Sequence, residues 1–149
     1  MTKEIEISQE HPRAESLRIR EKLIKHFKSG VVTSAGLIAH GRGEAFDYIL
    51  GEKTTEPALK ATGAAAATLL TAENPVISVN GNAAALASKD IVKLSKITKT
   101  RIEVNLFYRS LEREIAIRKL LEEAGATEVL GIGENASARI SEVGSERRR

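Results

Sequence analysis

Residues 76–107 read VISVNGNAAALASKDIVKLSKITKTRIEVNLF, with a β-rich run at each end and a helical stretch between them. Apolar residues alternate at Ile102, Val104 and Leu106, which is the period of a strand with one buried face. Residues 82–97 are expected to form a helix. Strands that alternate with helices of this length are typical of βαβ units, in which the two strands run parallel. The stretch therefore predicts an α/β fold.

The sequence on both sides extends this alternation. Residues 55–73 are rich in Ala and Leu, with Thr55 placed as an N-cap and Pro57 in the first turn, and they predict another helix. Ser110 can cap a helix that runs to residue 124. Residues 128–130 predict a third strand, parallel to the first two.

The length of 149 residues suits one domain. We expect a single three-layer α/β domain over residues 1–149, in which helices flank a mainly parallel sheet and residues 132–149 form a loop or tail. Hydrophobic residues make up 42% of the chain but aromatic residues only 3%, so the core must be aliphatic.

Composition excludes several classes of protein. Without cysteine, the chain can form neither disulfides nor thiolate metal sites, and its three histidines lack metal-ligand spacing, so no metal site is expected. The net charge of +3 is slight and its one dense basic run is Arg147–Arg149, which argues against nucleic acid as a partner. No apolar run approaches the roughly 20 residues that span a bilayer, and the charged N-terminus has no signal peptide. A cytoplasmic protein without a membrane partner is the expectation.

The N-terminal region predicts a helix from Pro12 to Lys28. Its apolar residues fall on one broad arc, and Arg20 lies inside that arc. A guanidinium on the core side needs an anionic partner, because an unpaired buried charge is costly. Two interpretations stay open: an internal salt bridge at the edge of the core, or an arginine that faces a ligand.

A second unusual stretch is GLIAHGRGEAFDYILGE, residues 36–52. Its glycines predict a turn around Gly41 and Gly43, followed by a helix from about Glu44 to residue 50. His40, Arg42, Glu44 and Asp47 lie within eight residues of one another. That inventory suits a solvated loop, and it also suits a site for a phosphate or carboxylate ligand.

The ends of the two strands carry further polar residues. Ligands of open parallel sheets bind outside the carboxyl ends of the strands. Asn80, Gly81 and Asn82 follow the first strand, and Asn82 can cap a helix whose free N–H groups attract an anion. Asn105 and Arg109 follow the second strand. Turn chemistry and surface charge are the alternative explanations. No G-x-x-x-x-G-K-[ST] loop and no Ser–His–Asp arrangement is present, and the catalytic residues stay unassigned.

Four runs together resemble a known family: HPRAESLRIREKLI, AGLIAHGRGEAFDYILGE, AENPVISVNGNAAAL and EVNLFYRSLERE. They are similar to the archaeal phosphopantothenate synthetases, or 4-phosphopantoate–β-alanine ligases, in order from His11 to about Gly131. The resemblance implies a Rossmann-like fold, a homodimer, and an ATP-dependent ligase that makes 4′-phosphopantothenate for coenzyme A. It further implies an acyl-adenylate intermediate, AMP and pyrophosphate as products, Mg²⁺ accompanying ATP, and Arg20 and Arg42 as ATP-binding residues.

The resemblance also implies that this chain is shortened, because family chains continue well past residue 149. Two hypotheses follow. The chain belongs to a ligase, or it is a catalytically incomplete α/β domain that binds a phosphorylated ligand or serves as a dimerisation remnant. The 149-residue chain is expected to fold, to expose an apolar patch, to self-associate and to show little ligase activity.

Overall fold

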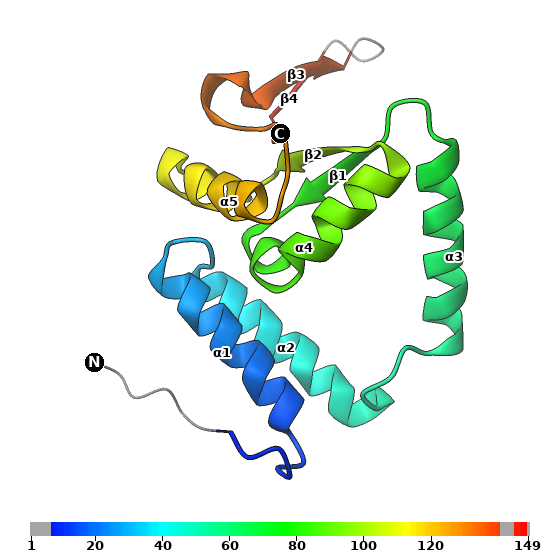
Figure 1. Cartoon of the computed structure of the whole chain (residues 1–149), viewed down its shortest axis with the longest axis vertical. Coiled ribbons are helices and arrows are strands. Elements are labelled where there is room, and N and C mark those ends of the chain that lie inside the picture. Colours follow the sequence, from blue (N-terminus) through cyan, green and yellow to red (C-terminus); the bar gives the residue numbers. More distant parts are fainter. Residues whose placement is uncertain (1–6, 141–144, 149) are drawn as a thin grey trace.

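A computed structural model of the chain describes residues 7–140 and 145–148. Figure 1 shows a pair of long helices at one end, a small sheet with two helices in the middle, and one helix that stands apart. The elements follow the order α1 (Ala14–Lys28), α2 (Ser34–Leu50), α3 (Glu56–Thr71), β1 (Val76–Val79), α4 (Gly81–Thr98), β2 (Arg101–Val104), α5 (Leu111–Glu123), η1 (Gly133–Ala136), β3 (Ser137–Ile140) and β4 (Ser145–Arg148).

The βαβ prediction is confirmed. Strands β1 and β2 pair in parallel, from Val76 opposite Arg101 to Val79 opposite Val104, and α4 connects them. The side chain of Asn80 caps α4, and Ser110 caps α5 as predicted. The protein is therefore helix-rich with a small parallel sheet, which agrees with an α/β fold.

The third strand is reduced to one bridge. Leu130 donates its N–H to the Ile102 carbonyl and accepts from the Val104 N–H, both over 2.9 Å. The chain then leaves the sheet at Gly131, whose φ of +82° is open to glycine but unfavourable for other residues. The prediction of a full strand at residues 128–130 is wrong, because of these three residues only Leu130 pairs with β2.

The two helices that pack on the sheet, α4 and α5, also pack against each other. α4 packs against α5, and α5 also packs against β2. Helices on opposite faces of a sheet would be too far apart to touch, so α4 and α5 lie on the same face and form two layers with the sheet. The core between them is aliphatic, as expected, and its largest fully buried side chains are Leu23, Val79, Val104, Ile117 and Leu121.

The expected turn at Gly41 and Gly43 is wrong, because α2 runs unbroken through both glycines. Each glycine costs about 1 kcal/mol in a helix interior. The flanking residues and the packing of α2 on α1 outweigh that cost. Thr33 begins the helix, since its side-chain oxygen accepts the Gly36 N–H over 3.2 Å.

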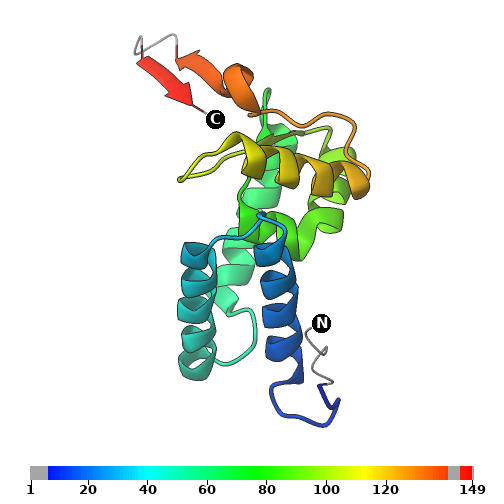
Figure 2. The ribbon, with the colours of Figure 1, turned by 90° about the vertical axis from the view of Figure 1, so that its left-hand side faces the viewer.

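The opposite end of the chain carries a second pair of strands. Within residues 132–149, expected as a loop or tail, the described residues form η1 and an antiparallel pair, β3 with β4. The view in Figure 2 places this pair at the far end of the molecule from α1 and α2. No helix among the described residues is long and apolar enough to cross a membrane.

Candidate functional site

Most of the predicted site residues fall into two groups, and each group includes neighbours that were not predicted: Arg13, Ser16 and Arg113. One group lies between α1 and α2, and we call it the helix-pair cluster: Arg13, Ser16, Arg20, His40, Gly43, Glu44 and Asp47. The other lies where β1 and β2 end, and we call it the sheet-edge cluster: Asn80, Gly81, Asn82, Asn105, Arg109 and Arg113.

Glu44 is the centre of the helix-pair cluster. Only 9% of its surface is exposed, although it is an acidic residue. Its Oε2 accepts a hydrogen bond from Arg20 Nη2 over 2.7 Å, and its Oε1 pairs with Arg13. Both arginines keep more than a third of their side chains exposed. Of the two interpretations of Arg20, the structure thus shows the salt bridge at the edge of the core.

A cavity of about 240 Å³ lies beside this ion pair. Residues 40, 43, 44 and 47 line it from one face of α2, at the i, i+3, i+4, i+7 spacing, and Ser16 and Ile19 line it from α1. His40 Nε2 is buried and has no hydrogen-bond partner among the described residues. The cavity has room for several water molecules at roughly 30 Å³ each. A ligand group that hydrogen-bonds to His40 would satisfy that nitrogen.

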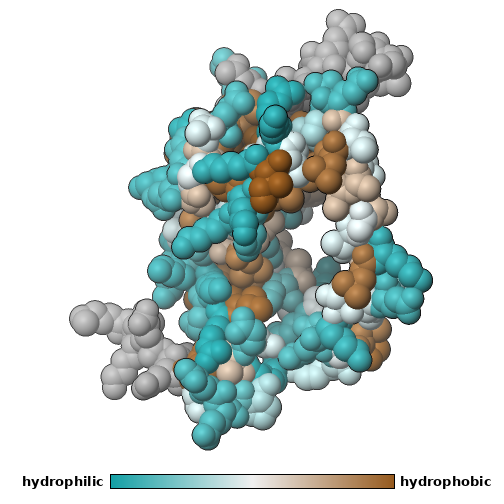
Figure 3. Space-filling model, turned by 45° about the vertical axis from the view of Figure 1, so that its right-hand side comes forward, coloured by the Kyte–Doolittle hydropathy of each residue, from teal (hydrophilic) through white to brown (hydrophobic). Residues whose placement is uncertain are grey.

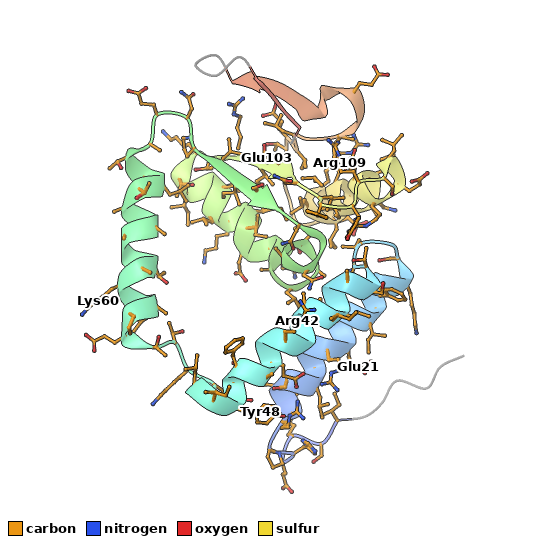
Figure 4. All side chains as sticks on the ribbon, turned by 180° about the vertical axis from the view of Figure 1, so that it is seen from behind. Glu21, Arg42, Tyr48, Lys60, Glu103 and Arg109 are labelled. Carbon is orange, nitrogen blue, oxygen red and sulfur yellow. The ribbon has the colours of Figure 1, made fainter. Side chains whose placement is uncertain are left out.

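Arg42 faces away from this cavity. Two residues along a helix correspond to a rotation of about 200°, so Arg42 lies on the side of α2 opposite Glu44. It is exposed and makes no ion pair with a described residue, and Figure 4 shows it near the middle of α2. Gly41 and Gly43 are exposed, and a Cβ at either position would meet only open space. Arg20 and Arg42, which the resemblance pairs as ATP ligands, therefore do not converge within one copy.

The sheet-edge cluster forms where parallel strands end together. The Asn105 N–H donates to the Val79 carbonyl over 2.9 Å, which sets Asn105 next to Asn80 at the carboxyl edge of the sheet. The cap of α4 is Asn80, whose Oδ1 accepts the Ala83 N–H over 3.0 Å. The prediction that Asn82 caps this helix is wrong.

Asn82 instead connects α4 to the helix pair α1–α2. Its side-chain Nδ2 donates to the Gly36 carbonyl at the start of α2 over 2.8 Å. Gly81 lies directly against the Val31 carbonyl, so closely that any Cβ there would collide with it. These contacts hold the loop between α1 and α2 against the first turn of α4.

The arginine of the second strand end is already neutralised. Arg109 donates through Nε and Nη2 to Glu114 Oε1, over 2.8 and 2.6 Å. The other oxygen of Glu114 accepts the Gly133 N–H over 2.8 Å, and the residue is 3% exposed. Arg109 thus helps to hold the chain after Leu130 onto α5, and it offers no unpaired charge.

Arg113 differs from Arg109 because it pairs with carbonyls rather than with a carboxylate. It donates to the Tyr108 carbonyl over 2.5 Å and to the Val31 carbonyl over 3.3 Å. Its Nε is buried without a partner among the described residues, and burial lowers the pKa of its guanidinium from the ordinary value. It is the cation of this cluster without a carboxylate partner in the described part of the chain.

Sequence reasoning did not identify Arg13 or Arg113 as site residues. Arg13 and Arg20 are seven residues apart and share one face of α1, so this spacing was a usable signal for a common anionic partner. For Arg113, the sequence offered no signal that its partners would be backbone carbonyls. The described residues contain no group of three or more His, Asp or Glu side chains arranged to hold a metal ion.

A sequence model of the phosphopantothenate/pantothenate synthetase family matches residues 57–149, more than half of the chain. The chain belongs to this family. Its resemblance extends to the N-terminal helices, because a 4-phosphopantoate–β-alanine ligase from Methanosarcina mazei is 54% identical over 136 residues, or 91% of this chain.

Two further family members agree. The 4-phosphopantoate–β-alanine ligase of Methanospirillum hungatei is 59% identical over 125 residues, which cover 84% of this chain and 51% of the ligase. That of Thermococcus kodakarensis is 49% identical over 144 residues, which cover 96% of this chain and 54% of the ligase. The chain spans about half the length of the curated relatives it matches.

Proposed function

We propose that this protein joins 4-phosphopantoate to β-alanine at the expense of ATP, giving 4′-phosphopantothenate, AMP and pyrophosphate for coenzyme A biosynthesis. The observation that carries the proposal is the 54% identity to a 4-phosphopantoate–β-alanine ligase over 91% of the chain. The aligned 136 residues make up 91% of the chain and so extend well beyond the core.

The reaction needs cations and hydrogen-bond donors more than it needs an acid or base. The carboxylate of 4-phosphopantoate attacks the α-phosphorus of ATP, forming an acyl-adenylate as pyrophosphate leaves. The amine of β-alanine then attacks the acyl carbon, loses a proton and displaces AMP. Every reactant except the attacking amine is an anion, so arginines and helix N-termini are the expected equipment. We assign no residue as general acid or base.

For ATP we propose Arg20 and Arg42, since a guanidinium can donate two parallel hydrogen bonds to phosphate oxygens. Arg20 is held by Glu44, so a phosphate at this position would exchange one anionic partner for another. His40, Gly41, Gly43 and Glu44 form the adjoining surface of α2. Mg²⁺ would accompany ATP and would offset the negative charge of its phosphates.

For the phosphate or carboxylate of 4-phosphopantoate we propose the sheet-edge cluster. The N-terminus of α4 lies at the carboxyl edge of the sheet, where its free N–H groups favour an anion. The Asn80 Oδ1 caps the helix, which leaves the side-chain Nδ2 to donate to the ligand. Gly81, Asn82, Asn105 and Arg109 shape the surroundings.

Three further proposals belong with this function. The protein acts in the cytoplasm, where coenzyme A is made. It acts as a homodimer, as the resemblance implies. The Rossmann-like three-layer arrangement stays a prediction, and it requires a layer beyond the two that the described residues form.

The test is product analysis with ATP, 4-phosphopantoate and β-alanine. We expect AMP and pyrophosphate from the full product of the gene, only when 4-phosphopantoate is present. From the 149-residue chain we expect binding of 4-phosphopantoate in calorimetry but little AMP, because the chain spans about half of its relatives' length. The Methanospirillum hungatei ligase serves as the positive control.

Other products would replace the proposal. ADP would indicate a kinase, and binding without any nucleotide cleavage by the full gene product would indicate the incomplete binding domain. As the residue-level arm, Arg42→Lys should lower AMP release tenfold or more at an unchanged melting temperature, because lysine cannot donate the parallel pair of hydrogen bonds. Near-normal turnover of this variant would remove Arg42 from the site.

A further inference from the structure

The cavity between α1 and α2 is surrounded by acidic groups. Asp47 lines it and makes no ion pair with a described residue. Ser16 lines it from α1 and donates its hydroxyl to Glu52 over 3.3 Å, which brings a second carboxylate next to the cavity. In Figure 3 the lower end of the molecule, where α1 begins, is mostly hydrophilic, which agrees with a polar site.

The nearby arginines do not cancel this negative charge. Arg13 and Arg20 both pair with Glu44, the third carboxylate at the cavity. Among the groups that line the cavity or bond to its lining, three carboxylates therefore face two guanidinium groups in the described part of the chain. Clefts lined by charge of one sign raise the local concentration of ligands of the opposite sign. The cavity thus favours a ligand that carries a positively charged group.

His40 adds a hydrogen-bonding position to the same cavity. Its Nε2 is buried and has no partner among the described residues, whereas most buried polar atoms in native proteins have one. The unprotonated nitrogen of a neutral imidazole accepts a hydrogen bond from an N–H group. Together with the Asp47 carboxylate, it offers two acceptors to an ammonium group.

The three substrates of the proposed reaction differ in charge and size. ATP and 4-phosphopantoate are polyanions, so a cavity with excess negative charge repels both. β-Alanine carries the one ammonium group among them. Clefts for drug-sized ligands have volumes of about 300–1,000 Å³, so the cavity of about 240 Å³ suits a smaller molecule. β-Alanine meets both the charge and the size requirement.

We propose that this cavity binds β-alanine, with the ammonium between Asp47 and His40 Nε2 and the carboxylate on Arg13. The assignment rests on the proposed function and gives a site to its amine substrate. A guanidinium has five N–H donors, and more than a third of the Arg13 side chain is exposed, so donors remain beside its pair with Glu44. Arg20, proposed above for ATP, holds the other oxygen of Glu44, which sets the amine substrate next to the nucleotide.

Gly43 agrees with this assignment. It lines the cavity in the middle of α2, where glycine destabilises a helix relative to alanine. A Cβ at this position would meet no atom within 4 Å, so the packing of the protein does not itself require a glycine. The missing side chain keeps the cavity open, and a small ligand explains why open space is retained there.

The test uses the full product of the gene and separates the two halves of the reaction. Asp47→Asn should raise the KM for β-alanine tenfold or more, because it removes the charge that pairs with the ammonium. It should leave unchanged the exchange of pyrophosphate into ATP that 4-phosphopantoate supports, since adenylate formation does not need β-alanine. As the matched control, Glu21→Gln removes one negative charge from α1 outside the cavity lining and should change neither quantity.

Two further measurements distinguish ligand binding from a structural role. 3-Hydroxypropionate carries a hydroxyl in place of the ammonium, so it should compete with β-alanine only weakly in the unmodified protein, and Asp47→Asn should narrow that difference in affinity. Gly43→Leu should raise the KM for β-alanine at an unchanged or higher melting temperature, because leucine fills the cavity and favours the helix.

The outcomes separate this assignment from the proposed function. Normal pyrophosphate exchange with an unchanged KM for β-alanine in Asp47→Asn would overturn the assignment alone. Loss of exchange in this variant would also overturn it, because the cavity would then serve ATP or 4-phosphopantoate. Absence of exchange in the unmodified protein would overturn the proposed function, and this assignment with it.

Discussion

Helices α3 and α4 have similar lengths and both are rich in alanine, but they occupy opposite environments. α4 buries Gly81, Ala84, Ala85 and Val92, while α3 buries none of its residues. Composition would suggest the reverse, because α4 carries four charged side chains, at residues 89, 90, 93 and 96, and α3 carries two. The more apolar helix is the more exposed one.

The difference lies in what each helix can reach. α4 directly follows β1 and precedes β2, so the connection itself folds it onto the sheet, where it also meets α1 and α5. α3 joins the helix pair to the sheet without belonging to either. The sequence of a helix thus shows that one of its faces must be buried. Its connections to neighbouring elements decide whether another part of the same copy buries that face.

The largest expected effect follows from the covered side of this comparison. Leu121 on α5 is fully buried against the core that α4 completes. Leu121→Ala should lower the free energy of unfolding by about 2–5 kcal/mol, because it removes apolar contacts and leaves a cavity. Chemical denaturation followed by circular dichroism measures this loss.

Leu70→Ala on α3 is the matched control. At protein concentrations too low for self-association, it should change the free energy of unfolding by less than about 0.5 kcal/mol, as exposed substitutions do. If both variants lost the same stability at low concentration, α3 would have to be packed within its own copy, and the contrast between the two helices would fail.

Prediction from the sequence was most successful where the structure depends on elements that are neighbours along the chain. Strand β1, helix α4 and strand β2 follow from local periodicity and short connections. The prediction of a third strand failed because only Leu130 of residues 128–130 pairs with β2, and so short a stretch has no periodicity that could show this. The unbroken α2 was missed because glycines at positions 41 and 43 argue locally for a turn, whereas packing on α1 overrides them.

The helix pair α1–α2 is intermediate in burial between α3 and α4, because it is covered on one side only. Glu44 is the anion that holds Arg13 and Arg20 there. Glu44→Gln should lower the free energy of unfolding by about 1–3 kcal/mol: buried pairs cost more to break, but both arginines remain partly in solvent. Thermal denaturation measures the change.

Glu15→Gln provides the comparison on the same helix. Its pair with Arg18 has an N–O distance of 3.6 Å, and the Glu15 side chain is 72% exposed. Such a pair contributes about 0.5 kcal/mol or less. Equal losses for the two variants would contradict a special role for Glu44 in holding the helices together.

The site was predictable in its residues but less so in its geometry. Asn80, Arg20 and Glu44 were identified from charge and strand ends, and each proves to have a defined partner. Which asparagine caps α4 depends on whether the helix begins at residue 81 or at residue 83, and the sequence does not resolve a difference of two residues. That Arg20 and Arg42 lie on opposite sides of α2 follows only once that segment is known to be one helix.

Helix caps extend the comparison at smaller magnitude. Ser110 caps α5 through its side chain, which accepts the Arg113 N–H over 3.3 Å, whereas Thr55 makes no side-chain cap bond to α3. Ser110→Ala should cost about 1 kcal/mol of stability, and Thr55→Ala should cost clearly less. A larger loss for Thr55→Ala, measured by the same denaturation, would mean that α3 has a hydrogen-bonded start after all.

The smallest expected effect concerns His26, at the covered end of α1. Its carbonyl accepts the N–H groups of the buried residues Val31 and Val32. Burial lowers the pKa of His26 below its ordinary value of 6.5, and Lys25 lowers it further. Because the folded protein resists protonation that the unfolded chain accepts, stability should fall as the pH drops below about 6.5 and should level off once the folded pKa is passed.

His26→Gln removes this contribution while keeping a polar side chain of similar size. The difference in unfolding free energy between wild type and variant, measured from about pH 7.5 down to about pH 5.5, should therefore shift against the wild type as the pH falls. A difference that is flat with pH, or that shifts the other way, would mean that the end of α1 is as open to water as α3.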